Sequence, residues 1–319
     1  MKNIKKILIL RTEHIGDYVL TIPSIKSIKK QFPKSEITTI IGPWNKELAE
    51  ATPYIDKIII FDNPLAKRHL NLKDIFIAFT FKLTKLIGLI KKLREEEYNL
   101  LIVFSNRQFN KVFIPLIKAR KKIYDFEFDK DKNDKKRYIE LLKKAGIKKI
   151  YHSADLEYSK KDEKVVKKIL GKGGEKNIVI NAITPLKEKN WSLEKWALLI
   201  NLLLKKNKKL TFFLTGSPNQ KEEIDNIIIK IKNKKNVFNL AGKISLVQTA
   251  LLIKNADLFV GSDSGPKQLA EQLTDTPTIS LFGPTNEKIW GPSRKIDKII
   301  KGETMDDISV EEVLKEIIK

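Results

Sequence analysis

The sequence predicts an α/β protein of two domains, each built around a parallel β-sheet. Short runs rich in isoleucine, leucine and valine alternate with longer helical segments along the chain. The alternation starts again after a glycine-containing segment at residues 171–176. A length of 319 residues is too great for one ordinary core and suits two. We therefore expect one domain at residues 1–170 and a second at 171–319, whose last helix could pack back on the first.

In the first half, the apolar runs are typical of strands buried on both faces of a sheet. The expected strands cover residues 5–10, 36–41, 57–61, 100–104 and 121–125. The expected helices cover residues 17–31, 49–52, 74–96, 112–119 and 136–145. Gly146 follows the last helix, a position where helices often end. The charged segment 129–136 predicts a loop.

The second half repeats the pattern. The expected strands cover residues 177–181, 209–215, 237–240, 258–260 and 278–282. The expected helices cover residues 193–206, 219–232, 245–254, 267–273 and 310–318, and Ser192 is a suitable N-cap for the first of them. Parallel sheets bind ligands at the carboxyl ends of their strands. We therefore expect a functional site where two such sheets face a cleft between the domains.

Composition excludes several kinds of site and location. The chain has no cysteine, so disulfides and thiolate metal sites are excluded. Its three histidines, His14, His69 and His152, have no ligand spacing, so a histidine zinc site is not expected. No apolar run approaches the roughly 18 residues of a membrane span, and a signal peptide is not expected. These features predict a cytoplasmic protein.

The formal net charge of +23 indicates an anionic partner. Nucleic acid, an anionic membrane face and a heavily phosphorylated substrate are the three candidates. Lysine, isoleucine and asparagine are all abundant, so compositional drift of the source genome accounts for part of the excess. The aromatic residues are not interleaved with the basic runs, and no recognised nucleic-acid motif appears. Both observations argue against a basic nucleic-acid-binding protein without catalysis, which is the alternative from another functional class.

The first candidate site is the run from Arg11 to Asp17, after the first strand. Gly16 lets the backbone turn sharply into the helix, and Asp17 comes at or near the helix start. Asp17 could simply be an N-cap, the commonest use of aspartate at such a place. Alternatively, it is an exposed general base. His14 could be structural, could contact substrate or could change the pKa of the carboxylate.

The second candidate is Ser262-Asp263-Ser264-Gly265-Pro266, between a buried strand and a helix. Backbone amides at the helix start and the serine hydroxyls would form an anion site. Asp263 cannot bind phosphate itself, so we expect it to orient amides, a sugar hydroxyl or a nearby lysine. An ordinary capped turn also favours these residue types. The next strand ends in a second glycine-containing loop, Gly283-Pro284-Thr285, which favours the functional interpretation.

Two further turns follow strands of the second half. Lys187 and Lys189 lie in the segment from Thr184 to Trp191, where a lysine can neutralise a diphosphate. In so lysine-rich a chain, either could equally be a solvated surface residue. The run from Thr215 to Pro218 is again a strand end with a glycine turn before a helix.

Together these stretches resemble glycosyltransferase family 9, the family of the ADP-heptose–lipopolysaccharide heptosyltransferases. The segments that carry the resemblance are Ile7 to Arg11, Gly16 to Pro23, Tyr98 to Phe104, Arg137 to Leu142, Asp263 to Pro266 and Leu281 to Thr285. The resemblance covers nearly the whole chain. It implies a GT-B architecture of two Rossmann-like domains, the first binding the acceptor and the second the nucleotide-sugar.

The resemblance also implies roles for individual residues. Asp17 would be the base that deprotonates the acceptor hydroxyl for inverting attack, without an obligatory metal or other cofactor. The implied donor-binding residues are Thr184, Lys189, Gln220, Ile244, Asp263, Ser264, Gly265 and Gln268. On the acceptor side we expect Arg11, His14, Arg68, Arg107 and Lys111.

The chain departs from the family's pattern at two places. Gln268 stands where the heptosyltransferases usually have histidine, and Gln220 where they often have glutamate. Glutamine can hydrogen-bond but cannot change charge, so both departures bear on the donor's identity. The predicted partners are ADP-heptose or a related nucleotide-sugar, an anionic glycolipid such as the lipopolysaccharide inner core, and the inner face of an anionic membrane. A different acceptor (a secondary metabolite, a protein or a capsule glycan) and an inactive homologue are alternatives.

Overall fold

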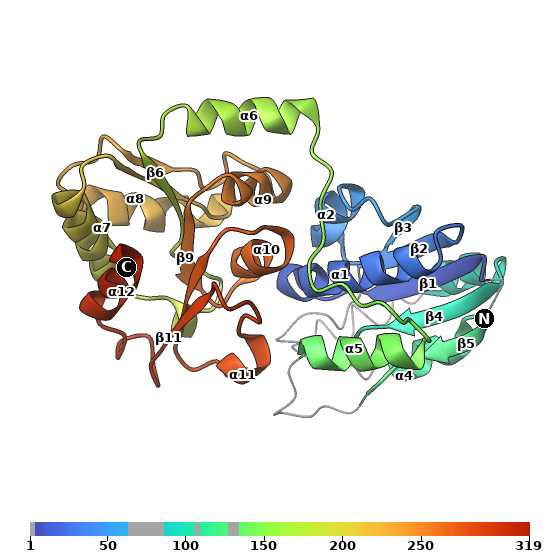
Figure 1. Cartoon of the computed structure of the whole chain (residues 1–319). Helices are drawn as coiled ribbons and strands as arrows, with labels where there is room; N and C mark the ends of the chain where they lie inside the picture. Colours follow the sequence, from blue (N-terminus) through green and yellow to red (C-terminus); the bar gives the residue numbers. More distant parts are fainter. Residues whose placement is uncertain (1–3, 63–85, 106–108, 127–133) are drawn as a thin grey trace. The chain divides into compact units, whose positions relative to one another are not determined.

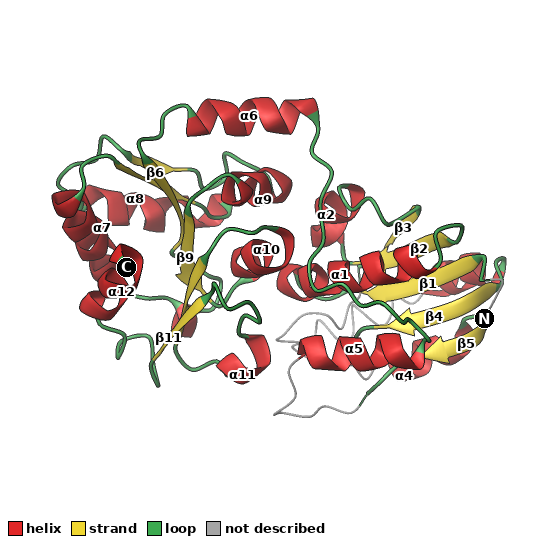
Figure 2. Cartoon of the chain, viewed as in Figure 1, coloured by secondary structure: helices red, strands yellow, loops and turns green. Residues whose placement is uncertain are grey.

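The computed structural model describes residues 4–62, 86–105, 109–126 and 134–319. The chain forms two compact units, Met1–Ala154 and Asp155–Lys319. Each unit contains one parallel β-sheet flanked by helices (Figures 1 and 2). The predicted α/β class with two parallel sheets is confirmed. Arg68 and Arg107 lie outside the described residues.

The first unit has a five-stranded sheet in the order β3-β2-β1-β4-β5. Its strands are β1 (Lys6–Arg11), β2 (Glu36–Ile41), β3 (Lys57–Ile60), β4 (Tyr98–Val103) and β5 (Ala119–Ile123). Its helices include α1 (Ile15–Gln31), α2 (Lys46–Glu50), α4 (Phe109–Phe113) and α5 (Asp134–Lys144), and residues 86–94 are also helical. The central strand β1 is buried between β2 and β4, so the turn that follows it starts from a rigid base.

Some element bounds in this unit differ from the prediction. The first helix starts two residues early, at Ile15. The helix expected at 112–119 is instead α4 and a 3-10 turn, because Ala119 already pairs with Tyr98 in the sheet. Gly146 has φ 81°, the left-handed conformation that suits glycine after a helix end. The loop expected at 129–136 overlaps residues outside the described ranges, and α5 begins at Asp134.

The second unit has a six-stranded sheet in the order β11-β10-β9-β6-β7-β8. Its strands are β6 (Lys176–Asn181), β7 (Leu210–Leu214), β8 (Val237–Asn239), β9 (Leu258–Ser262), β10 (Thr278–Phe282) and β11 (Lys298–Lys301). Its helices are α6 (Lys160–Leu170), α7 (Leu193–Lys206), α8 (Lys221–Ile229), α9 (Leu246–Lys254), α10 (Gly265–Leu273), α11 (Glu287–Trp290) and α12 (Val310–Ile318). Helices α7 and α12 lie on one side of the sheet and α9 and α10 on the other (Figure 1).

Three elements of the second unit were not predicted: β11, α6 and the one-turn helix α11. Strand β11 is a largely exposed edge strand that begins and ends with lysine, so it lacks the apolar signal of its neighbours. Helix α6 is very polar, but Ser159 and Asp162 form a capping box at its start that the sequence does show. The helix predicted at 219–232 is a 3-10 turn followed by the shorter α8.

The division between the units falls sixteen residues before the predicted boundary at 170/171. Helix α6 groups with the second unit because it packs on α9, and Asp162 accepts a hydrogen bond of 2.9 Å from Gln248. The last helix, α12, packs against α7 and the strands β10 and β11 of its own unit.

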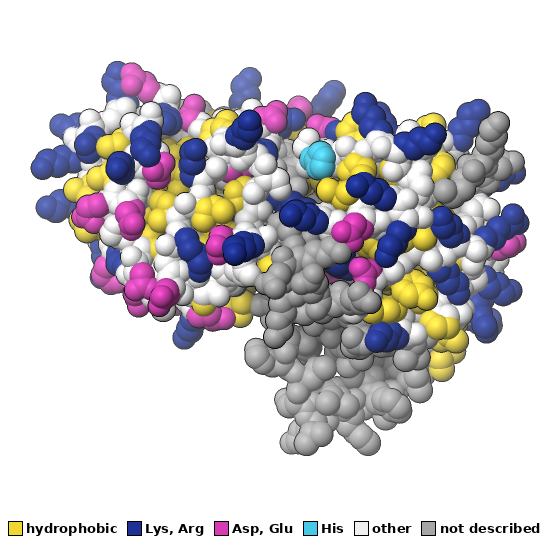
Figure 3. Space-filling model, turned by 60° about the horizontal axis from the view of Figure 1, so that its bottom comes forward, with side chains coloured by type: hydrophobic (Ala, Val, Ile, Leu, Met, Phe, Trp, Pro, Cys, Tyr) yellow, Lys and Arg dark blue, Asp and Glu magenta, His cyan; other side chains and the backbone are white. Residues whose placement is uncertain are grey.

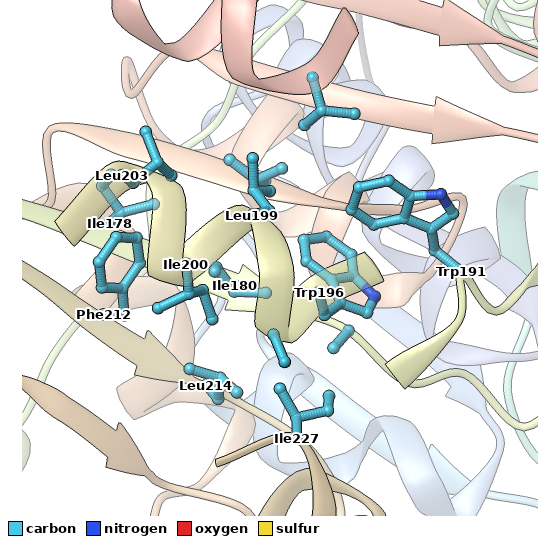
Figure 4. Close-up of a cluster of buried hydrophobic side chains, with 14 of the residues drawn as sticks. Ile178, Ile180, Trp191, Trp196, Leu199, Ile200, Leu203, Phe212, Leu214 and Ile227 are labelled. Atoms are coloured by element: carbon cyan, nitrogen blue, oxygen red, sulfur yellow. The ribbon is translucent and has the colours of Figure 1, made fainter. Parts of the chain in front are cut away.

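The core of the second unit holds the loop after β6 in place. Trp191 and Trp196 are fully buried and meet edge to face with their ring centroids 5.0 Å apart (Figure 4). The indole N–H of Trp191 donates to the carbonyl of Ile308, 3.0 Å away. Burying two indoles stabilises the fold by several kcal/mol, on the order of 2–3 each. The segment before Trp191, which carries Lys189, is therefore anchored at its end.

Candidate functional site

Asp17 lies in the first turn of α1 and is not its N-cap. The N-cap is His14, which makes no side-chain capping hydrogen bond. The Asp17 side chain is 20% exposed, and its Oδ1 lies 3.2 Å from Nη2 of Arg11. A carboxylate in a first helical turn is stabilised by the backbone N–H groups there. The structure therefore presents Asp17 as a partly exposed carboxylate with a fixed cationic partner.

Arg11, the last residue of β1, is buried with 3% of its surface exposed. Its Nη1 donates to the carbonyl of Phe104 at 2.8 Å, and its Nε donates to the Asp17 carbonyl at 3.3 Å. Burial lowers the pKa of this guanidinium, yet the phenol of Tyr138 and nearby carboxylates raise that pKa above the ordinary value. Arg11 is thus a permanent cation in a fixed position.

Glu13 is a second buried carboxylate beside Arg11, with Oε2 3.6 Å from Nε. Its Oε1 accepts a hydrogen bond from the hydroxyl of Ser105, which in turn accepts from Asn110 at 2.6 Å. The Glu13 carbonyl accepts from Asn45 at 2.8 Å. Hydrogen bonds to both the backbone and the side chain of Glu13 therefore fix the loop between β1 and α1. Sequence reasoning missed Glu13 because burial of a lone glutamate leaves no pattern in the sequence.

Arg137 of α5 completes this group. It donates to the same Phe104 carbonyl at 2.7 Å and to Asp134 at 3.1 Å. We call Arg11, Glu13, Asp17 and Arg137 the arginine cluster. It joins the carboxyl ends of β1 and β4, two adjacent strands, to the first turn of α1.

The other acceptor-side candidates lie apart from these contacts. The His14 ring stacks on Trp44 with centroids 5.9 Å apart. Lys111 is exposed, with its Nζ 5.6 Å from the ring of Phe126. An acceptor contact by any of these residues stays a prediction.

In the second unit, Thr184 and Asn190 fold the loop after β6 back on itself. The backbone N–H of Thr184 donates to Oδ1 of Asn190 at 2.7 Å, and Nδ2 of Asn190 returns a bond to the Thr184 carbonyl at 3.1 Å. The Thr184 hydroxyl donates to the Leu186 carbonyl at 2.9 Å. These bonds shape the 3-10 turn Lys187–Lys189, and they fix the direction of its last residue.

Lys189 reaches Asp263 from this turn. Its Nζ lies 2.6 Å from Oδ2 of Asp263, and the two side chains are 15% and 9% exposed. Lys187, two residues earlier, is exposed. The structure therefore distinguishes two lysines that the local pattern left equivalent, and it brings Lys189, the one that the family resemblance singled out, into contact with Asp263.

A second lysine, Lys267, contacts the same aspartate from inside the molecule. Its side chain is fully buried, with Nζ 3.8 Å from Oδ1 of Asp263 and 3.1 Å from Oε1 of Glu271. Sequence reasoning assigned it no role. We call Lys189, Asp263, Lys267 and Glu271 the lysine cluster.

The start of α10 carries the remaining residues of the Asp-Ser-Gly motif. Ser264 is the N-cap, and its hydroxyl accepts from the backbone N–H of Lys267 and donates to Asn181 at 2.9 Å. Gly265 is the first helical residue. Gln268 is 2% exposed; its Nε2 donates to the Trp290 carbonyl at 3.2 Å. Among the described residues its Oε1, also buried, has no hydrogen-bond partner.

Gln220 and Ile244 belong to neighbouring loops. Gln220 accepts from the Ser217 backbone at 2.8 Å and donates to the Ile183 carbonyl at 3.1 Å, so both ends of its amide already support the fold. Gly242 has φ 69° and packs against Pro218, which brings the half-buried Ile244 beside that loop.

All eight predicted donor-binding residues follow the carboxyl ends of four adjacent strands. Thr184 and Lys189 follow β6, Gln220 follows β7, Ile244 follows β8, and the Asp-Ser-Gly motif follows β9. This is the edge at which parallel sheets bind ligands. The geometry suits an anionic ligand, with one lysine at the surface and a helix N-terminus beside it.

The surface charge is spread rather than gathered. Lysine and arginine side chains are scattered over the visible face of both units, with acidic side chains between them (Figure 3). Within the described ranges, no helix is long and apolar enough to cross a membrane. In that part of the chain, no group of three or more histidine or acidic side chains could hold a metal ion.

Comparison with known proteins gives consistent matches. The family model of glycosyltransferase family 9 (heptosyltransferase) matches residues 86–316. Lipopolysaccharide heptosyltransferase 3 of Escherichia coli is 26% identical over 297 residues, covering 87% of this chain and 83% of that protein. The solved structure of the glycosyl transferase family 9 protein from Veillonella parvula DSM 2008 has a TM-score of 0.80 at 18% identity, and the match covers 98% of this chain and 95% of that one. The structure of E. coli heptosyltransferase WaaC with ADP-2-deoxy-2-fluoro heptose has a TM-score of 0.73 at 18% identity, covering 98% and 99%. These structures share the predicted GT-B fold.

Proposed function

The chain belongs to glycosyltransferase family 9, and on that premise we propose that it transfers a heptose or similar sugar from ADP-heptose, or a related nucleotide-sugar, to a phosphorylated glycolipid core such as the lipopolysaccharide inner core. The protein is a glycosyltransferase. Two similar proteins support the donor and acceptor: one is a lipopolysaccharide heptosyltransferase, and the other was solved with an ADP-heptose analogue.

The Lys189–Asp263 pair carries the proposal. It places an ammonium group, held at 2.6 Å by a carboxylate, at the strand edge where this fold binds ligands. A diphosphate has more negative charge than the aspartate and would draw the lysine to itself. The N-terminus of α10 lies next to Asp263 and would add neutral backbone donors.

Asp17 is our candidate for the base. Its carboxylate would take the proton of an acceptor hydroxyl while that oxygen bonds to the anomeric carbon of the donor. The bond from that carbon to the diphosphate oxygen would break, and the nucleoside diphosphate would leave. The configuration at the anomeric carbon would be inverted. Arg11 supports this role, since it holds one carboxylate oxygen of Asp17 at 3.2 Å while 20% of the side chain stays exposed.

We propose that the reaction needs no obligatory metal, because Lys189 and the α10 N-terminus can stabilise the leaving diphosphate. The net charge of +23 supports peripheral contact with the inner, anionic face of a membrane, where a glycolipid acceptor would be found. Such contact would weaken as salt is raised.

A donor panel tests the proposal. The purified chain is incubated with ADP-heptose and other nucleotide-sugars and with a phosphorylated glycolipid acceptor, and products are identified by mass spectrometry. We expect transfer from one donor class, with the Michaelis constant for the donor raised at least about thirtyfold in Lys189→Ala. Lys187→Ala is the matched control from the same turn and should behave as the unmodified protein. Failure of every donor both to bind and to react would refute the function.

A second candidate is transfer within the same family from a different donor. Gln268 favours it, because it is an uncharged amide where the heptosyltransferases usually have histidine, and its buried oxygen has no hydrogen-bond partner among the described residues. Gln268→His should strengthen binding of ADP-heptose if that sugar is the native donor. Unchanged or weaker binding would favour a different sugar or nucleotide.

A further inference from the structure

Lys267 is the most deeply buried charged residue next to the candidate donor site. Its side chain has no exposed surface, and its Nζ donates to the Trp290 carbonyl at 2.5 Å. The same Nζ lies 5.0 Å from the ring centroid of Phe282. A lysine is almost never fully buried without charged partners, because the cost of removing the ammonium group from water is large.

The partners of Lys267 make the lysine cluster electrically neutral. Lys189 and Lys267 contribute two positive charges, and Asp263 and Glu271 two negative charges. Asp263 is shared, with Oδ2 at 2.6 Å from Lys189 and Oδ1 at 3.8 Å from Lys267. Loss of any one member would leave a charge without its counterpart in a largely buried place.

Binding of a diphosphate would disturb this balance. If Lys189 turns to the phosphates, Asp263 loses its nearer cation, although its side chain is only 9% exposed to water. Lys267 is then the cation that still compensates Asp263. Without Lys267, Asp263 would depend on Lys189 alone and would hold it more strongly against the incoming phosphate.

Lys267 also fixes a second part of the same edge. Its ammonium group and the amide of Gln268 both donate to the Trp290 carbonyl, at the end of α11. Helix α11 follows the Gly283-Pro284-Thr285 loop after β10. One buried side chain therefore connects the Asp263 carboxylate to the neighbouring loop.

We propose that Lys267 is a positioning residue of the donor site, which keeps Asp263 compensated so that Lys189 can pass from Asp263 to the diphosphate of the nucleotide-sugar. This role rests on the proposed function, because it needs a diphosphate ligand at Lys189. It concerns Lys267 acting through Asp263, and it requires no contact between Lys267 and the ligand.

The test measures binding of ADP by calorimetry and thermal unfolding of each variant. Lys267→Met should weaken ADP binding about tenfold and lower the unfolding temperature. The matched variant Lys267→Met/Glu271→Gln restores a neutral cluster and should recover most of the stability, yet its ADP binding should stay weak. It also carries the test if the single variant does not fold.

A double-mutant cycle isolates the route through Asp263. In an Asp263→Asn background Lys189 has no carboxylate to leave, so adding Lys267→Met should change ADP binding less than about twofold. An equal loss in both backgrounds, or normal binding in the neutral double variant, would overturn the proposal. If the unmodified protein binds ADP and the variants match it, only the role of Lys267 fails. If the unmodified protein binds neither ADP nor any other nucleoside diphosphate, the proposed function fails with it.

Discussion

The arginine cluster of the first unit and the lysine cluster of the second are built on the same plan with opposite polarity. Each has three members at the end of a central strand and in the helix that follows it, and each has a fourth member, Arg137 or Lys189, from another segment. In the arginine cluster, the most exposed charged group is the carboxylate of Asp17. Its side chain is 20% exposed, whereas the side chain of its partner Arg11 is 3% exposed. In the lysine cluster, the most exposed charged group is the ammonium group of Lys189. Its side chain is 15% exposed, whereas the side chain of its partner Asp263 is 9% exposed.

The choice of cation explains the difference in what each cluster can do. A guanidinium is planar and offers several donors in fixed directions, so Arg11 can hold Asp17 and the Phe104 carbonyl together. A lysine ammonium is a point charge on a flexible stem and can change partners. The arginine cluster is therefore suited to holding a base still, and the lysine cluster to releasing a cation to a ligand.

The largest expected effect comes from removing the exposed carboxylate. Asp17→Asn keeps the size and the hydrogen-bonding oxygen but cannot accept the proton, so the turnover rate should fall about a thousandfold. Binding of ADP should be unchanged, because the donor residues lie in the other unit. Turnover and calorimetry on the same preparation check this, with Glu50→Gln on the exposed end of α2 as control. Full activity of Asp17→Asn would exclude it as the base.

Exchanging the two kinds of cation tests the comparison directly. Arg11→Lys keeps the charge but loses the donors to Phe104 and Asp17, so the free energy of unfolding of the first unit should fall by about 2 kcal/mol. Lys189→Arg retains a cation at a partly exposed place, and it should cost the second unit less than about 1 kcal/mol. Denaturant unfolding followed by near-ultraviolet dichroism measures both. Equal losses would mean that guanidinium geometry has no special part in the first cluster.

A smaller effect is expected outside both clusters, at the cap of α6. Hydrogen bonds from Ser159, and then from Gln248, lower the pKa of Asp162 below its ordinary value. Its contribution to stability is therefore present above the ordinary aspartate pKa and is lost as the pH falls through the lowered one. Asp162→Ala should cost about 1 kcal/mol at neutral pH. The difference in free energy of unfolding between this variant and the unmodified protein should narrow on acidification below about pH 4. Denaturant unfolding at a series of pH values measures this difference. A constant difference would argue against the titration of Asp162.

Much of the fold could be predicted because its strands are buried on both faces and its helices begin with recognisable caps. The helix Leu193–Lys206, the strand Thr278–Phe282 and the helix Val310–Ile318 have the bounds that the sequence predicted. Strand β11 was missed because an exposed edge strand carries no continuous apolar run. Helix α6 was missed because its buried side is narrow and the rest is charged.

The sequence by itself determined the α/β class, the order of most elements and the turns at which polar residues follow strands, since these depend on local pattern and turn chemistry. Only the tertiary structure decided which charges meet. It paired Lys189 with Asp263, which is 74 positions away, and left Lys187 exposed. It also buried Glu13 and Lys267, two residues that no local pattern marks. The physical reason is that a buried charge is costly unless an opposite charge lies close to it in space. Separation along the chain does not reveal that distance.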